Sequence, residues 1–163
     1  MTASEAPRFL ADGNVGKLAR RLRMLGFDAA FAHPVDDDEL VRIAEAEERI
    51  LFTRDVYVLY RRIVAEGRVQ ALLITRDDVP TQLRQVLRAL DLHPPFPVFT
   101  RCLECNVPLA PAIRSDVVGD VPPFVIATQE VFTRCPCCRR VYWPGTHREN
   151  MLRELAEILG EPL

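Results

Sequence analysis

Two pairs of cysteines have the spacing of a zinc site. Cys102 and Cys105 enclose Leu-Glu, and Cys135 and Cys138 enclose Pro-Cys, so each pair has the form Cys-x-x-Cys. Two such pairs supply the four thiolates of a tetrahedral zinc site, which leaves no coordination position open for a substrate. We therefore predict a structural zinc ribbon with Cys102, Cys105, Cys135 and Cys138 as its ligands.

The fifth cysteine makes the second pair ambiguous. Cys137 could replace a neighbour as ligand, although Cys138 fits the spacing better. His147 is a weaker rival ligand. Disulfide bonds are the alternative use of these thiols, but in a reducing compartment this spacing favours metal.

Basic and aromatic residues follow the second cysteine pair directly. They are Arg139, Arg140, Tyr142 and Trp143. Such a run can bind single-stranded nucleic acid through phosphate contacts and base stacking. The alternative is that the two aromatic side chains pack the ribbon against the rest of the protein, and both interpretations stay open.

Carboxylates follow the apolar runs of the first half of the chain. Asp12, Asp55 and Asp77 each come after a predicted strand, and an acidic run occupies positions 36–39. In an open α/β sheet these positions meet outside the carboxyl ends of the strands. Gathered carboxylates suit Mg²⁺ or Mn²⁺, which could support attack of water on a phosphodiester.

The alternative role of these aspartates is helix capping. An Asp at a strand–helix junction commonly accepts hydrogen bonds from the free N–H groups of the helix start. We expect Asp37 to serve in both roles, and Asp77 with Asp78 to form a turn.

Cations near the acidic positions are candidates for phosphate contacts. Gly13 to Gly16 opens a predicted helix that carries Lys17, Arg20 and Arg21, and Arg54 lies beside Asp55. A helix N-terminus with nearby cations attracts phosphate. A solvated basic helix face is the alternative interpretation, and Arg54 could instead pair with an acid.

The elements that would position these residues alternate along the first half of the chain. Apolar runs predict strands, and 3.6-residue periodicity with start and stop signals predicts helices. Four successive strand–helix units indicate an open, mostly parallel α/β sheet, with the apolar run 69–75 in its middle. The predicted strands are 9–11, 29–32, 49–53 and 69–75, and the predicted helices are 16–25, 37–48, 56–66 and 80–90.

The second half of the chain has a different character. A proline-rich stretch near His93 marks a boundary, so we expect an α/β domain over 8–95 and a zinc ribbon over 98–146. The 29 residues between the cysteine pairs leave room for a small hairpin. A C-terminal helix is expected within 147–160, packed on the body, with its apolar face over about 148–159.

Composition is that of an ordinary soluble globular protein. Of the 163 residues, 48% are hydrophobic and 27% charged, and no apolar run approaches the ~20 residues of a membrane helix. Residues 1–7 have no apolar signal-peptide core, so we expect a cytoplasmic protein. The net charge is −2, and all but one of the 21 basic residues are arginine. Arginine suits bidentate phosphate contacts. The alternative explanation for the excess of arginine over lysine is a GC-rich genome, which favours arginine codons.

Three runs of the sequence resemble the Mut-seven C-terminal RNase domain family. They are FLADGNVGKLARRLRMLGFDA, DDELVRIAEAEERILFTRD, and CLECN followed by CPCCRRVYWPGTH. The resemblance covers about residues 8–151, and its signals are specific in combination. It implies a PIN-like nuclease fold with a C-terminal zinc ribbon. Cys137 departs from the family pattern, in which a small non-ligand residue is usual.

The resemblance also implies an acidic site. The family's metal-binding carboxylates fall on Asp12, on Asp37 at the start of the D-x-x-L helix, and on Asp55 of the TRD strand end. Asp38 is the reserve choice for the second position because three aspartates stand in a row. The implied activity is a Mg²⁺- or Mn²⁺-dependent ribonuclease.

Together these features lead us to expect a ribonuclease whose substrate is RNA, most simply single-stranded RNA. Lys17 and Arg20 would contact the phosphates, and the zinc ribbon would help to dock the strand. One alternative is a non-catalytic RNA- or ribosome-binding module in which the ribbon alone contacts RNA. Another is a chain held by a protein partner such as an antitoxin-like regulator. DNA as substrate is also open, because nothing in the sequence indicates a contact to a 2′-hydroxyl.

Overall fold

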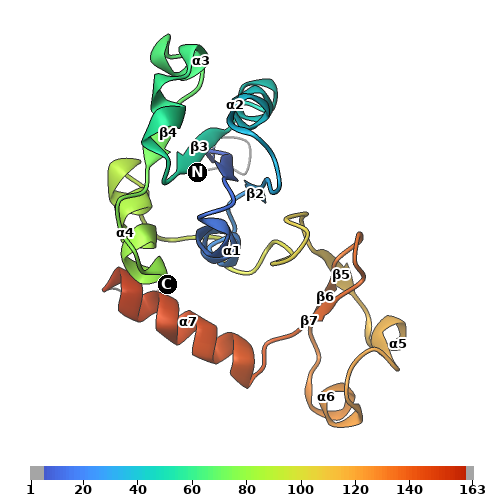
Figure 1. The fold of residues 1–163 in the computed structure, drawn as a ribbon. Helices are drawn as coiled ribbons and strands as arrows, with labels where there is room; N and C mark the ends of the chain where they lie inside the picture. Colours follow the sequence, from blue (N-terminus) through green and yellow to red (C-terminus); the bar gives the residue numbers. More distant parts are fainter. Residues whose placement is uncertain (1–5, 161–163) are drawn as a thin grey trace.

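A four-stranded parallel sheet forms the centre of the α/β part (Figure 1). The computed structural model describes residues 6–160. All three strand pairings are parallel, so the carboxyl ends of the strands lie at one edge of the sheet. The strands are β1 (Phe9–Ala11), β2 (Ala29–Phe31), β3 (Ile50–Thr53) and β4 (Ala71–Leu73), in the order β2-β1-β3-β4.

Helices cover both faces of this sheet. Because side chains alternate along a strand, Phe9 and Phe52 enter one hydrophobic cluster and Leu10 and Leu51 enter another. The first cluster lies against α1 and α4, and the second against α2. The helical segments of this part are α1 (Gly16–Met24), α2 (Asp37–Ala46), the 3₁₀ helix η1 (Val56–Tyr60), α3 (Arg62–Ala65) and α4 (Val79–Ala89).

The C-terminal helix α7 (Thr146–Leu159) returns to the α/β part. Leu155 and Ile158 are buried in the same cluster as Phe9, and α7 contacts α4. Figure 1 shows α7 running from the ribbon back along α1 and α4. The helix begins two residues earlier than its apolar face predicted, at Thr146 directly after Gly145.

The cysteine-rich region forms a small separate sheet to one side of the body (Figure 1). Its strands are antiparallel in the order β5-β6-β7. The expected hairpin is present as the β5–β6 pair, with two short helices inserted between its strands. The elements are β5 (Ala110–Ala112), α5 (Arg114–Val117), α6 (Pro123–Thr128), β6 (Phe132–Arg134) and β7 (Val141–Tyr142).

Two details of the predicted elements were wrong. The helix over 56–66 is broken at Arg61, whose ψ of 136° is extended, so it becomes η1 and α3. The strand β4 lies at the edge of the sheet and not in its middle. Its apolar character has another cause: Leu72 packs against one core cluster and Ala71 against the other, so both faces of this edge strand are covered.

The predicted fold class is confirmed: a mostly parallel sheet flanked by helices is followed by a cysteine cluster and a final helix. The domain boundaries at 8–95, 98–146 and 147–160 stay a prediction. No helix within residues 6–160 is long and apolar enough to cross a membrane. The expectation of a cytoplasmic protein rests partly on residues 1–5, and these lie outside the described residues.

Candidate functional site

Asp12 and Asp55 are joined through Thr53 at the carboxyl ends of β1 and β3. The buried hydroxyl of Thr53 donates a hydrogen bond to Oδ2 of Asp12. The same hydroxyl oxygen accepts a hydrogen bond from the backbone N–H of Asp55 at 3.0 Å. Oδ1 of Asp12 accepts from the N–H of Asn14 at 2.7 Å. Asp12 is therefore fixed in place, with only 7% of its surface exposed.

Asp55 has one oxygen in use. Its Oδ1 accepts a hydrogen bond from the N–H of Tyr57 at 2.8 Å and so caps η1. Among the described residues, no group donates a hydrogen bond to its Oδ2. This half-buried carboxylate can thus cap η1 and still bind a cation, because a carboxylate has about four lone-pair sites.

The acids after β2 are arranged differently from the expectation. The N-cap of α2 is Asp36, whose side chain accepts from the N–H of Glu39 at 2.8 Å, so the prediction that Asp37 caps this helix was wrong. Asp37 and Asp38 each form an ion pair with Arg61 at 3.1 Å. The preference for Asp37 over Asp38 as second site residue stays a prediction.

The three predicted site aspartates do not form a closed cation cage. Among the described residues, only the cysteine cluster brings three or more ligand atoms within reach of one ion. Mg²⁺, however, usually keeps several waters and is held by only one or two carboxylates. Asp12 and Asp55 offer hard carboxylate oxygens of the kind that Mg²⁺ or Mn²⁺ prefers, and Thr53 ties the carboxylate of Asp12 to the backbone of Asp55.

Most of the predicted phosphate-binding cations are already paired. Arg20 forms an ion pair with Glu104, Arg21 with Glu154 and Arg54 with Asp77. Lys17 is exposed in the first turn of α1 and forms no ion pair within residues 6–160. Arg20 and Arg21 lie toward the ribbon and α7, so of the set on α1, Lys17 is the one beside the loop that carries Asp12. Their role in substrate binding stays a prediction.

Aromatic rings flank the acidic edge, and the sequence reasoning missed them. A Cβ on Gly13 would come within 2.6 Å of the ring of His33, and one on Gly16 within 2.7 Å of the ring of Phe31. The two rings stack on each other with centroids 6.1 Å apart. Tyr57, two residues after Asp55, is 72% exposed. The available signal was the position of Phe31 and His33 directly at the end of β2.

The four predicted zinc ligands come together. The sulfur atoms of Cys102, Cys105, Cys135 and Cys138 all lie within 4.8 Å of one another. The sulfurs of Cys102 and Cys138 are 3.7 Å apart. A tetrahedral site with Zn–S bonds of about 2.3 Å requires about 3.8 Å between sulfurs. The cluster could therefore hold zinc with these four sulfurs as its ligands.

The two cysteine pairs have the same backbone conformation, which resolves the ambiguity at Cys137. In each pair the N–H of the second cysteine donates to the first sulfur at 3.4 Å. In each, the next residue, Asn106 or Arg139, has a positive φ and donates to the carbonyl of the first cysteine at 3.0 Å. Cys138 thus occupies the position of Cys105. Cys137 is exposed, and neither it nor His147 belongs to the cluster.

Tyr142 supports the cluster from the body side. Its hydroxyl accepts a hydrogen bond from the N–H of Leu103 at 3.1 Å and contacts the sulfur of Cys102 at 3.3 Å. Burial opposes ionisation of Cys102, but the hydrogen bonds from Tyr142 and from backbone N–H groups outweigh it and lower the pKa of this thiol to about 6. Tyr142 therefore has a structural role, and a ready thiolate is what a zinc site needs.

Buried polar contacts fix the first cysteine pair to the α/β part. Arg23 donates to the carbonyls of Leu103 and Glu104 at 2.8 and 2.9 Å. Asn106 donates to Asp28 at 2.6 Å and accepts from the N–H of Ala29 at 3.0 Å. These contacts join segments about 80 residues apart in the sequence, so the ribbon is anchored to the start of β2.

Asp28 is the centre of this anchor, and its loss should be costly. Replacing Asp28 by Ala leaves the guanidinium of Arg49, 6% exposed, with Glu47 as its remaining acidic partner, and removes the acceptor of Asn106. We expect a loss of about 3 kcal/mol in the free energy of unfolding, because the change removes two hydrogen bonds to a half-buried charged group. Urea unfolding followed by circular dichroism measures this. Asp77→Ala, which breaks an exposed pair with Arg54, should change it by less than about 0.5 kcal/mol.

The Asp28 effect should depend on pH. Burial tends to raise the pKa of Asp28, but hydrogen bonds from Arg49 and Asn106 outweigh it and hold the pKa below its usual value. A lowered folded pKa gives stability that is fully present above the unfolded pKa of about 3.9 and is lost as the pH falls through the folded pKa. The difference between wild type and Asp28→Ala should thus be constant near neutral pH and shrink below about pH 4. A difference that stays constant down to acid pH would contradict this account.

The fold and these two sites define an α/β protein with a carboxylate pair at a strand edge and an attached four-cysteine metal cluster. The family described as the Mut7-C RNAse domain matches residues 7–155, and the chain belongs to this family. Membership suggests a nuclease-like, RNA-related function. No curated protein and no solved structure matches the chain.

Proposed function

We propose that this protein is a metal-dependent ribonuclease that hydrolyses single-stranded RNA at the carboxyl edge of β1 and β3. The observation that carries the proposal is the linkage of Asp12 and Asp55 through the hydroxyl of Thr53. A buried Asp12 held by two hydrogen bonds is positioned more rigidly than a helix cap requires. Such fixed carboxylates at a strand edge are typical of a site whose geometry serves a reaction.

Asp12 and Asp55 would hold the cation, which when bound stabilises the attacking and leaving oxygens of the phosphodiester. The chain's own residues do the rest. Thr53 holds the carboxylate of Asp12 and the backbone N–H of Asp55, and Lys17 supplies a positive charge that forms no ion pair within residues 6–160. Arg61 holds Asp37 and Asp38 as ion pairs, which limits repulsion between these acids and the site.

The aromatic side chains around the edge favour a single strand as substrate. Phe31 and His33 are exposed beside the loop that carries Asp12, and Tyr57 is exposed two residues after Asp55. Unpaired bases can stack on such rings, each at a gain of about 1–3 kcal/mol, whereas bases within a duplex are not available for stacking. The zinc ribbon, anchored rigidly to the body, would extend the surface on which the strand docks.

The test is cleavage of a labelled single-stranded RNA with Mn²⁺ by wild-type protein, beside a duplex of the same sequence. We expect the single strand to be cut and the duplex to resist. Asp55→Asn should lower the rate by about 100-fold or more, the usual scale for a positioned catalytic carboxylate. Asp91→Asn is the matched control, because Asp91 is exposed and pairs only with His93 among the described residues. A wild-type protein that cuts neither RNA with Mn²⁺ or Mg²⁺ would contradict the proposal.

One observation favours a second function, non-catalytic RNA binding. Most acids at the edge already have a structural role: Asp36 caps α2, Asp55 caps η1 and Asp37 pairs with Arg61. On this hypothesis the ribbon binds RNA and the acids serve only the fold. RNA binding that survives Asp12→Asn and Asp55→Asn, needs no added Mn²⁺ and is lost on zinc removal, without cleavage, would select it.

A further inference from the structure

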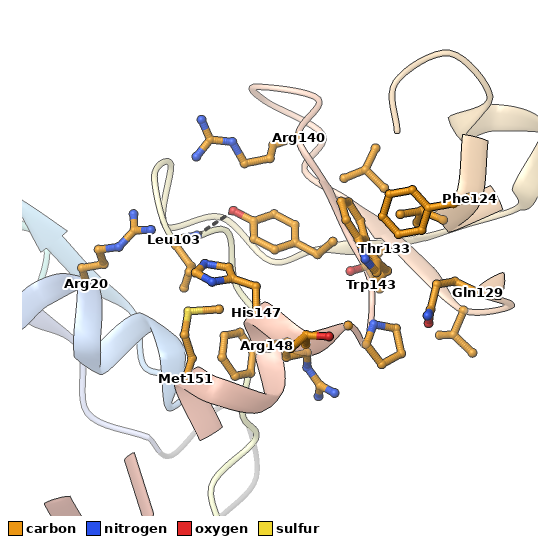
Figure 2. Close-up of a pocket in the computed structure, with 18 residues that line it drawn as sticks. Arg20, Leu103, Phe124, Gln129, Thr133, Arg140, Trp143, His147, Arg148 and Met151 are labelled. Atoms are coloured by element: carbon orange, nitrogen blue, oxygen red, sulfur yellow. Dashed lines mark hydrogen bonds between the residues drawn. The ribbon is translucent and has the colours of Figure 1, made fainter. Parts of the chain in front are cut away.

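A pocket of about 560 Å³ lies between the zinc ribbon and the start of α7 (Figure 2). Figure 2 shows Arg20 and Met151 on the side of the α/β part and Phe124 and Gln129 on the side of the ribbon. Small-molecule sites typically enclose about 300–1,000 Å³. The pocket is therefore large enough for one nucleotide and too small for a duplex.

The chemistry of the wall is apolar with positive charge. Of the described residues that line the pocket, three are arginine, one is histidine and none is acidic. Arg20 and Arg140 share the single carboxylate of Glu104, which itself lies outside the wall. Arg148 has no acidic partner within residues 6–160 and lies over the ring of Phe99 at 5.2 Å. The wall thus keeps a net positive charge that would attract an anion.

The aromatic side chains of the pocket include the chain's one tryptophan, Trp143. A Cβ on Gly145 would come within 2.8 Å of its indole nitrogen, so this glycine allows the ring to lie against the start of α7. Phe124 also lines the pocket and is 68% exposed, so its ring is accessible to a ligand. These rings offer flat apolar surface for a base.

The start of α7 contributes a place for a phosphate. Gly145, Thr146 and His147 line the pocket, and the N-terminus of this 14-residue helix has no side-chain cap. Its first N–H groups and the guanidinium of Arg148 can bind an anion. Base surface and anion site therefore occur within one cavity.

We propose that this pocket binds one unpaired nucleotide of the RNA, with the base against Trp143 and Phe124 and the phosphate at the start of α7 beside Arg148. The inference rests on the proposed function for the identity of the polymer. Arg20 lines the pocket and lies on α1 only four residues, about 6 Å, from the start of the helix beside the Asp12 loop. On this proposal, a strand that leaves the acidic edge runs along Lys17 and Arg20 toward the pocket, and the bound nucleotide helps to set where the strand is cut.

The first test uses Trp143 as its own reporter, because no other tryptophan is present. Zinc-loaded protein without Mn²⁺ is titrated with uridine and adenosine 5′-monophosphate, the matching nucleosides, inorganic phosphate and a short single-stranded RNA. We expect the nucleotides and the RNA to quench Trp143 emission, the nucleosides to do so more weakly, and phosphate alone to have no effect. No change with any nucleotide or with RNA would overturn the proposal and leave the pocket to a protein ligand.

Paired variants locate the binding. Phe124→Ala and Arg148→Gln should each weaken RNA binding about tenfold, within the range measured for loss of one stacking or charged contact. Ile113→Ala is the control for the first, being 67% exposed on the ribbon but outside the pocket. Arg153→Gln, on α7 but outside the pocket, is the control for the second. Equal binding by all four variants would overturn the proposal.

The two proposals fail in different ways. If wild type cuts no RNA but nucleotides still quench Trp143, and Phe124→Ala weakens this, the pocket holds and the ribonuclease proposal fails. If wild type cuts RNA and Phe124→Ala and Arg148→Gln bind and cut like wild type at the same positions, the acidic site holds and the pocket proposal fails.

Discussion

Replacing Cys138 by Ser should remove zinc and unfold the ribbon, whereas replacing Cys137 should leave both intact. The core of the ribbon is small: its buried cluster consists of Val117, Val121, Val125 and Phe132. A core of this size does not hold a fold without a staple. Zinc binding in comparable small domains contributes about 10–16 kcal/mol, and most of this is folding free energy.

The measurements are the zinc content per chain and protease cleavage between residues 106 and 134. For Cys138→Ser we expect little bound zinc and rapid cleavage in this segment, while the α/β part, which has its own core, keeps most of its circular dichroism signal. For Cys137→Ser we expect wild-type zinc content, because Cys137 stands where Glu104 stands in the first pair and is exposed. Zinc loss in Cys137→Ser with retention in Cys138→Ser would reverse the ligand assignment.

The zinc cluster could be predicted from the sequence because its geometry is mostly local. Each Cys-x-x-Cys turn positions two sulfurs through hydrogen bonds within five residues, and only the meeting of the two turns is long-range. The local pattern did not reveal the anchor. Asn106 follows the first cysteine pair, and its partner Asp28 lies 78 residues away in the sequence, so no local pattern connects them.

The acidic edge, like the zinc cluster, could be predicted from the sequence only in its local features. Strand ends follow from apolar runs, so the placement of Asp12 and Asp55 at one edge could be expected. The pairing of Asp37 with Arg61 could not, because it depends on a break in the predicted helix 56–66. Thr53 was overlooked although it is a polar residue at the end of an apolar strand; its hydroxyl acquires significance only once β1 lies beside β3.

The second large effect is expected at Asp12. Asp12→Asn should lower the rate of RNA cleavage by at least about 100-fold, because the amide keeps the shape of the side chain but loses the charge that holds a cation. Thr53→Val should lower it less than Asp12→Asn does, by at most about 100-fold, since both carboxylates remain and only the hydroxyl that holds the carboxylate of Asp12 and the backbone N–H of Asp55 is lost. The measurement is single-turnover cleavage of labelled RNA with Mn²⁺, after each variant has been shown to be folded and zinc-loaded.

Asp28→Asn provides the matched control. Asp28, like the buried Asp12, is a carboxylate held by several hydrogen bonds; it is half-buried, and it precedes β2 and so lies at the opposite edge of the sheet. It should lose stability and keep its cleavage rate below its melting temperature, whereas Asp12→Asn should lose cleavage and keep most of its stability. This crossed result separates a chemical role from a structural one.

The opposite result would be equally informative. If Asp12→Asn cuts RNA at the wild-type rate, the hydrogen bonds of Asp12 to Asn14 and Thr53 serve only the turn that begins α1. The chemistry would then have to be placed elsewhere, and the remaining acids at the edge would be reduced to caps and ion pairs. Quenching of Trp143 by nucleotides in the same variant would still report on RNA binding, so the loss of one assignment would not remove the other.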